Sequence, residues 1–177
     1  MILRRQFLIG LGAALALSAC AAQGPSVGRD AGALNVRAVT VDVSELQSGV
    51  EGRNTTVTMA QVKRDLETAL SASLAQSSDP AGTPVRVTVE VSEVHLTSRV
   101  SAAVAGGASF VEGLVSVSEL ETDRQVLAPT TIKGSSETLR LPGVIGIVTS
   151  PSAENDYLET ISGFTETVKN ALFGEDT

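Results

Sequence analysis

The chain has 177 residues, of which 42% are hydrophobic and 19% are charged, so it is long and apolar enough to form one domain with a core. Its formal net charge is −7 and it has no basic run, which argues against nucleic acid and against electrostatic docking on anionic lipid. One cysteine excludes an intramolecular disulfide, and one histidine argues against a zinc site. We expect no metal and no cofactor.

The N-terminal residues 1–19 have the three parts of an export signal. Arg4 and Arg5 form a basic start, residues 7–17 are apolar, and small residues precede Cys20. The apolar run is too short to span a bilayer as a stable helix, so it is typical of a signal peptide.

The segment Leu17-Ser18-Ala19-Cys20 resembles the lipobox of bacterial lipoproteins. The resemblance implies cleavage between Ala19 and Cys20, transfer of diacylglycerol to the thiol and acylation of the new N-terminus. Each buried methylene contributes about 0.8 kcal/mol, so two or three acyl chains would hold the protein at a membrane almost permanently.

The export route stays open between two alternatives. Residues 4–8 resemble the twin-arginine motif, but Leu3 and Ile9 stand where that family has Ser/Thr and Lys, so the general secretory route remains equally compatible. Position 21 is alanine rather than aspartate, and its resemblance to known sorting rules implies the outer membrane, facing the periplasm.

Residues 20–33 are predicted to be the lipidated cysteine and a flexible tether rich in Gly, Ala and Ser, and residues 34–177 a single domain. Alternating valines predict a strand over residues 34–43. Thr58 and Gln61 have the spacing of a capping box, and a helix is expected from there to about Ser77. Its predicted buried face contains Val62, Leu66, Ala69, Leu70 and Leu74.

Three further strands and a second helix are predicted in the rest of the chain. The strands cover residues 85–91, with a bulge or bend near Glu93, then residues 110–120 and 125–133. Pro129 either places the last strand at a sheet edge or ends its pairing. A helix capped by Ser150-Pro151 should end at Gly174. Its predicted buried face contains Leu158, Ile161, Phe164, Thr165, Val168 and Leu172.

This β-α-β-β-β-α order predicts an α+β fold: an antiparallel sheet of about four strands with two helices packed on one face. Together with the lipobox, the layout resembles small uncharacterised envelope lipoproteins of Gram-negative bacteria. It is also similar to accessory lipoproteins of lipopolysaccharide export and of lipid-transport ABC systems. The resemblance brings no matching motif, so it assigns no functional residue.

The sequence contains no convincing catalytic group, and we expect the protein not to be an enzyme. Residues 24–28 match Gly-x-Ser-x-Gly only within the tether, without the strand and helix that this motif requires. His95 has no identifiable nucleophile to activate. The carboxylate pairs Glu90/Glu93 and Glu119/Glu121, and the pair Asp42/Glu45 as cation ligands, are interpreted as solvated charges.

Two apolar, glycine-rich segments, residues 102–110 and 141–148, have two open interpretations. They are either sites of close backbone packing or an exposed surface that contacts lipid or a protein partner. The possible contact residues are Gly106, Gly107, Val144, Ile145 and Ile147.

The predicted function is a membrane-anchored, non-enzymatic binding or assembly-support module, held by acyl chains on Cys20 and contacting an envelope protein. The alternative is a lipid-binding or transport-accessory lipoprotein of an envelope lipid or lipopolysaccharide transport system. A hydrolase is the least supported reading.

Overall fold

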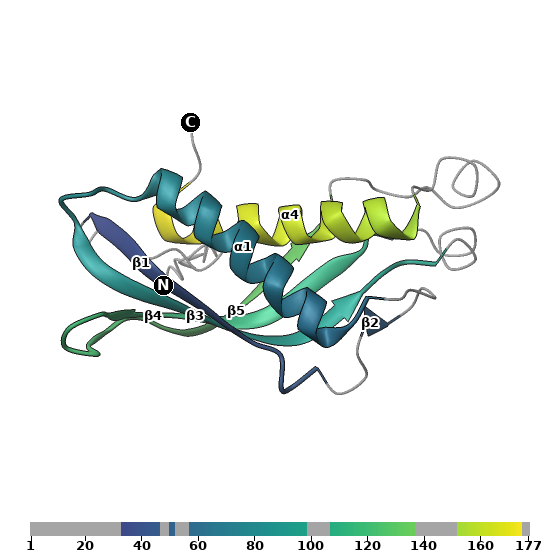
Figure 1. Ribbon diagram of the computed structural model, residues 1–177, viewed down its shortest axis with the longest axis horizontal. Coiled ribbons are helices and arrows are strands. Elements are labelled where there is room, and N and C mark those ends of the chain that lie inside the picture. The colour runs from purple at the N-terminus through teal and green to yellow at the C-terminus, as the bar shows by residue number, and fades with distance from the viewer. Residues whose placement is uncertain (1–32, 47–49, 52–56, 99–106, 137–151, 175–177) are drawn as a thin grey trace, which may run out of the picture.

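A computed structural model of the chain describes residues 33–46, 50–51, 57–98, 107–136 and 152–174. Two helices lie together on one face of a sheet, whose strands form a single layer beneath them (Figure 1). The predicted α+β class is therefore confirmed. In chain order the elements are β1 (Leu34–Asp42), β2 (Val50–Glu51), α1 (Met59–Ser77), β3 (Thr83–His95), β4 (Phe110–Glu119), β5 (Gln125–Ser135) and α4 (Ala153–Phe173).

The sheet is mixed, and the prediction of a fully antiparallel sheet is wrong. The strand order is β1-β3-β4-β5, with β1 parallel to β3 and the pairs β3/β4 and β4/β5 antiparallel. The short strand β2, which was not predicted, also pairs in parallel with β3 and changes the predicted element order. The physical reason is the connection through α1, because a strand that returns to the sheet after a helix runs parallel to the strand before it.

Helix α1 follows its sequence pattern closely. The Thr58 hydroxyl accepts a hydrogen bond from the Gln61 backbone N–H at 3.2 Å, so the predicted cap forms. The side chains that α1 buries against the sheet are Val62, Leu66, Leu70 and Leu74. They pack on inward-facing valines of the central strands, which gives the core its aliphatic character.

The central and edge strands carry the irregularities that the sequence indicated. The register between β3 and β4 shifts between Val91 and Glu93, which confirms the predicted bend. β5 lies at the edge of the sheet and its register with β4 is interrupted near Pro129, as expected for a residue without a backbone N–H.

Helix α4 differs from its prediction in where it begins and in what it buries. Its N-cap is Ser152 rather than Ser150, and Leu158, predicted to be in the core, is 53% exposed. Gly174 ends the helix with a positive φ of 87°, as predicted. α4 approaches β5 very closely at Gly163, where an added Cβ would come within 2.0 Å of the Ser135 carbonyl oxygen.

Candidate functional site

The surface predicted from the glycine-rich segments lies only partly within the described residues. Gly107 is exposed and has a φ of 122°, a conformation that favours glycine. Gly106, Val144, Ile145 and Ile147 lie outside the described residues, as do Cys20, predicted to be lipidated, Ala19, predicted to precede the cleavage site, and Arg4 and Arg5 of the predicted export signal.

A buried polar cluster joins the described ends that flank these segments. The Ser109 hydroxyl donates to Asp156 Oδ2 at 2.8 Å and accepts from the Thr97 backbone N–H at 2.9 Å. The Ser136 backbone N–H donates to the Ser109 carbonyl at 3.0 Å. These contacts fasten the end of β3, the start of β4, the end of β5 and the start of α4 to one another.

The cluster is structural rather than catalytic. Ser109 and Asp156 have no exposed surface, so no substrate reaches the hydroxyl. A serine nucleophile also needs a base that removes its proton, and the partner here is a carboxylate within a buried network. No periodic pattern indicates this cluster, because its members are far apart along the chain.

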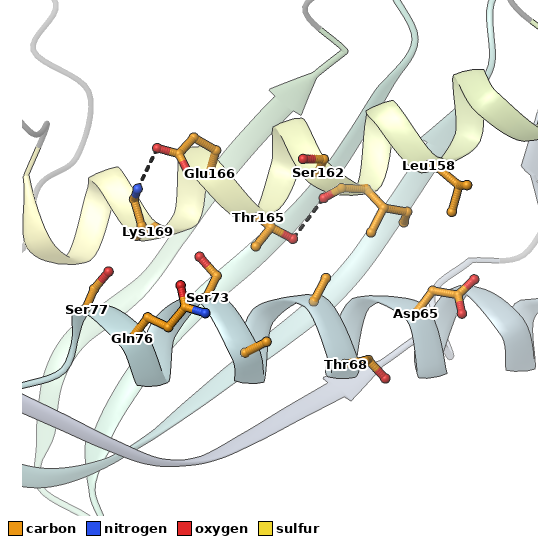
Figure 2. Close-up of a pocket in the computed structure, with 13 residues that line it drawn as sticks. Asp65, Thr68, Ser73, Gln76, Ser77, Leu158, Ser162, Thr165, Glu166 and Lys169 are labelled. Atoms are coloured by element: carbon orange, nitrogen blue, oxygen red, sulfur yellow. Dashed lines mark hydrogen bonds and ion pairs between the residues drawn. The ribbon is translucent and has the colours of Figure 1, made fainter.

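A surface groove with a volume of about 830 Å³ lies between α1 and α4. Figure 2 shows the side chains of both helices converging on it from its two walls. The α1 wall consists of Asp65, Thr68, Ala69, Ala72, Ser73, Gln76 and Ser77, and the α4 wall of Leu158, Ile161, Ser162, Thr165, Glu166 and Lys169.

One end of the groove is fixed by a hydrogen bond between the two helices. The buried Tyr157 hydroxyl donates to Asp65 Oδ2 at 2.9 Å. Burial of the phenol, and then its hydrogen bond to the Asp65 carboxylate, raise the pKa of Tyr157 above its ordinary value. Tyr157 therefore stays protonated and holds α4 against α1 across the physiological pH range.

The other end of the groove carries the ionic pair Lys169–Glu166, at 2.8 Å within α4. Between the two ends, the lining is mainly hydroxyls and small side chains, and the Thr165 hydroxyl donates to the Ile161 carbonyl at 2.8 Å (Figure 2). Such a surface offers hydrogen-bond donors and acceptors and allows close backbone approach.

Sequence reasoning missed this groove as a unit. Ile161 and Thr165 are buried as predicted, and Ala69 packs against the core, but these residues also line the groove. Leu158, predicted to be buried, lines the groove as an exposed side chain. The available signal was the stripe of small side chains beside the aliphatic stripe of α1, at Ala69, Ala72 and Ser73. The small residue Ser162 lines the groove from α4.

His95 lies on the opposite face of the sheet from the helices. Its ring stacks on Phe110 with centroids 5.4 Å apart, and Lys133 Nζ lies 3.4 Å from the Phe110 ring centroid. Lys133 is also paired with Glu112 at 3.2 Å. His95 is therefore part of a stack of side chains across neighbouring strands. The described contacts of its ring include no nucleophile.

Two of the carboxylates considered from the sequence, Glu119 and Asp42, accept hydrogen bonds from residues close to them in the chain. Glu119 accepts hydrogen bonds from Arg124 and Thr122, and these bonds lower the pKa of Glu119. Asp42 accepts from the Ser44 backbone N–H at 2.8 Å, which lowers the pKa of Asp42. Neither is suited to donate a proton, and no group of three or more His, Cys, Asp or Glu side chains that could hold a metal occurs among the described residues.

No family model matches the chain, and no curated protein matches it. Among solved structures, protein XCC0632 from Xanthomonas campestris, described as a DUF330 protein, is 12% identical, with 78% of each chain covered and a TM-score of 0.40. Dodecameric PelC from Paraburkholderia phytofirmans is 12% identical over 78% of this chain and 91% of that one, with a TM-score of 0.37. At these TM-scores neither likeness carries an inference about function. In the described part of the chain, neither helix has the length and apolar character needed to cross a membrane.

Proposed function

We propose that the protein is a lipid-anchored, non-enzymatic binding module of the bacterial cell envelope, held at the periplasmic face of the outer membrane by acyl chains on Cys20. The observation that carries the proposal is the lipobox Leu17-Ser18-Ala19-Cys20, directly followed by a Gly/Ala-rich tether. Leu34, which follows this segment in the sequence, is the first residue of the edge strand β1.

The groove between α1 and α4 is the surface that best suits binding to a protein. Its walls present several hydroxyls, the Gln76 amide, the Asp65 carboxylate and the Lys169 ammonium, spread along two helices. A partner segment with complementary polar groups can be recognised by hydrogen bonds there, since the small side chains leave its backbone room to approach.

The lipid-carrying alternative receives less support from the described residues. A lipid acyl chain requires an enclosed apolar cavity, whereas the groove is lined mainly by polar side chains and the valine and leucine core is packed between the helices and the sheet. Mass spectrometry of the natively purified protein distinguishes the two: we expect no stoichiometric lipid other than that attached to Cys20.

The proposal is tested by chemical crosslinking of the tagged full-length protein in intact cells, using a matched pair of α1 variants. Ala72 lines the groove and Ala75 is exposed on the same helix outside it. We expect the wild type and Ala75→Arg to yield the same specific crosslinked partner and Ala72→Arg to lose it, because the arginine fills the groove. A wild type that yields no partner, or an Ala72→Arg variant that retains it, would contradict the groove as the binding surface.

A further inference from the structure

The two sides of the groove between α1 and α4 carry different charges. On α1, the stretch from Thr68 to Ser77 contains no charged residue. On α4, Glu159, Ser162 and Glu166 are exposed, and their spacing of three and four residues places them on one stripe of the helix. The stripe borders the groove, because Ser162 and Glu166 line it. The groove thus has an uncharged side on α1 and an acidic side on α4.

The basic side chains near the groove leave this asymmetry in place. Lys169 pairs with Glu166 at 2.8 Å, but the Lys169 side chain is only 17% exposed, against 54% for Glu166, so the carboxylate is the charge that faces solvent. Arg64 precedes the uncharged stretch of α1 and is followed by Asp65, whose carboxylate accepts from Tyr157. Electrostatic complementarity therefore favours a cationic partner along α4 and an uncharged surface along α1.

The lining of the groove has the spacing of helix-to-helix packing. The lining residues of α1 are at positions 65, 68–69, 72–73 and 76–77, and those of α4 at 158, 161–162, 165–166 and 169, one set for each helical turn. From Asp65 to Ser77 the α1 side is about 18 Å long. A third helix can place its own rows of side chains between such rows. An extended segment finds no strand edge here, because backbone groups inside a helix bond to one another.

The middle of the groove allows a third helix to come close. Ala69, Ala72 and Ser73 form the α1 side there, and the distance between two packed helices falls with the size of the side chains at their contact. On the α4 side, Ser162 lies between Leu158 and Glu166 (Figure 2). Leu158 is 53% exposed, so an apolar side chain of the partner gains contact area by covering it.

The following inference rests on the binding function proposed for the groove. We propose that the partner segment is an amphipathic helix with basic residues along one flank. Its small side chains lie on Ala69 and Ala72, and an apolar side chain covers Leu158. Glu159 and Glu166 are seven residues apart, about 10 Å along the helix axis. Lys or Arg side chains seven residues apart on the partner helix therefore reach both carboxylates.

The segment that occupies the groove is identified by a photoreactive amino acid placed at Ser162 of the tagged full-length protein in intact cells. Mass spectrometry then reads the peptide crosslinked to it. We expect a helix with Lys or Arg residues seven apart and small side chains on the adjoining face. The same photoreactive group at Glu90, an exposed residue of β3 outside the groove, should not capture this segment.

The acidic stripe is tested by removing its charges without changing the size of the side chains. A synthetic peptide with the sequence of the captured segment is titrated onto the full-length protein in detergent and followed by fluorescence anisotropy. We expect Glu159→Gln and Glu166→Gln each to raise the dissociation constant about threefold, because each removes one exposed ion pair. Glu90→Gln, the matched control, should leave it unchanged. High salt should weaken binding to the wild type and reduce the differences between the variants.

The outcomes separate this inference from the function on which it rests. A groove that captures no partner would contradict the binding function and the inference together. A captured segment that is acidic or lacks a helical pattern would overturn the inference alone, and the binding function would stand. Dissociation constants that are the same for wild type, Glu159→Gln and Glu166→Gln would also overturn it.

Discussion

Helices α1 and α4 lie side by side on the same face of the sheet, yet they are held there by different interactions. α1 buries an unbroken aliphatic stripe, formed by Val62, Leu66, Leu70 and Leu74. α4 buries aliphatic and aromatic side chains too, but among them are a carboxylate, a phenol and two threonine hydroxyls, at Asp156, Tyr157, Thr160 and Thr165. The position of α1 is set by its periodic apolar side chains, whereas that of α4 also depends on hydrogen bonds made by its buried polar side chains.

The buried polar groups of α4 divide into local and distant contacts. The hydroxyls of Thr160 and Thr165 donate to carbonyls of their own helix, at 2.6 Å and 2.8 Å. Asp156 and Tyr157 instead bond to Ser109 and Asp65, which lie on other elements. The distant bonds fix the position of α4 along the sheet and against α1, because an unpaired buried polar group is costly.

The largest expected loss of stability comes from truncating a side chain on the buried face of α1, and the matched control is a side chain on the exposed side of α4. Leu70→Ala should lower the free energy of unfolding by about 3 kcal/mol, since the side chain is fully buried and its removal leaves a cavity. Leu158→Ala, at a position that the same helical period marks as buried, should cost about 0.5 kcal/mol or less because Leu158 is 53% exposed. Urea unfolding measures both, and equal losses would contradict the placement of Leu158.

A somewhat smaller effect is expected from the distant bond of Asp156. Asp156→Ala leaves the Ser109 hydroxyl buried without its acceptor and should cost about 2 kcal/mol, and Ser109→Ala about 1 to 2 kcal/mol. Because the two residues share one bond, the double variant should lose less than the total of the single losses. Strictly additive losses in this double-mutant cycle would show that the bond does not hold α4.

A smaller effect at neutral pH than that of Asp156→Ala is expected from Tyr157→Phe, which removes one hydrogen bond and should cost about 1 kcal/mol. The contribution of the Tyr157 hydroxyl to the free energy of unfolding depends on pH. The folded state raises the pKa of Tyr157 above the ordinary 10.0, so this contribution is complete below pH 10.0 and is lost as the pH rises above it. The variant should therefore lose less stability than the wild type in alkaline solution.

The chain offers a direct readout of that ionisation. Tyr157 is its single tyrosine, so the ultraviolet absorbance of tyrosinate reports this residue alone. We expect it to ionise only as the protein unfolds. Reversible ionisation near pH 10.0 in the folded protein would contradict the buried bond to Asp65.

The elements of the fold were predictable from local patterns, but the pairing of β1 was not. Alternating valines identified β1 and β3, and Thr58 and Gln61 located the start of α1. The parallel pairing of β1 with β3 depends on where the chain re-enters the sheet after α1, which neither strand encodes by itself. The two-residue strand β2 is too short to produce a periodic signal.

The candidate groove was the least predictable feature. Periodicity in α4 correctly marked Phe164 and Val168 as buried but could not separate them from Leu158, because exposure depends on how far α1 extends over α4. Asp156 carried no sign of burial, since its partner Ser109 is distant in the sequence. Side chains that depend on partners elsewhere in the fold are beyond a local pattern.

The central claim is that acyl chains on Cys20 hold the domain at the membrane, and membrane fractionation of Cys20→Ser tests it most directly. We expect the wild type to remain with the outer membrane after washing in high salt and to release an N-terminal peptide that begins at an acylated Cys20. The Cys20→Ser variant should be released or should persist as uncleaved precursor. A variant that is cleaved normally and still retained at the membrane would contradict the account.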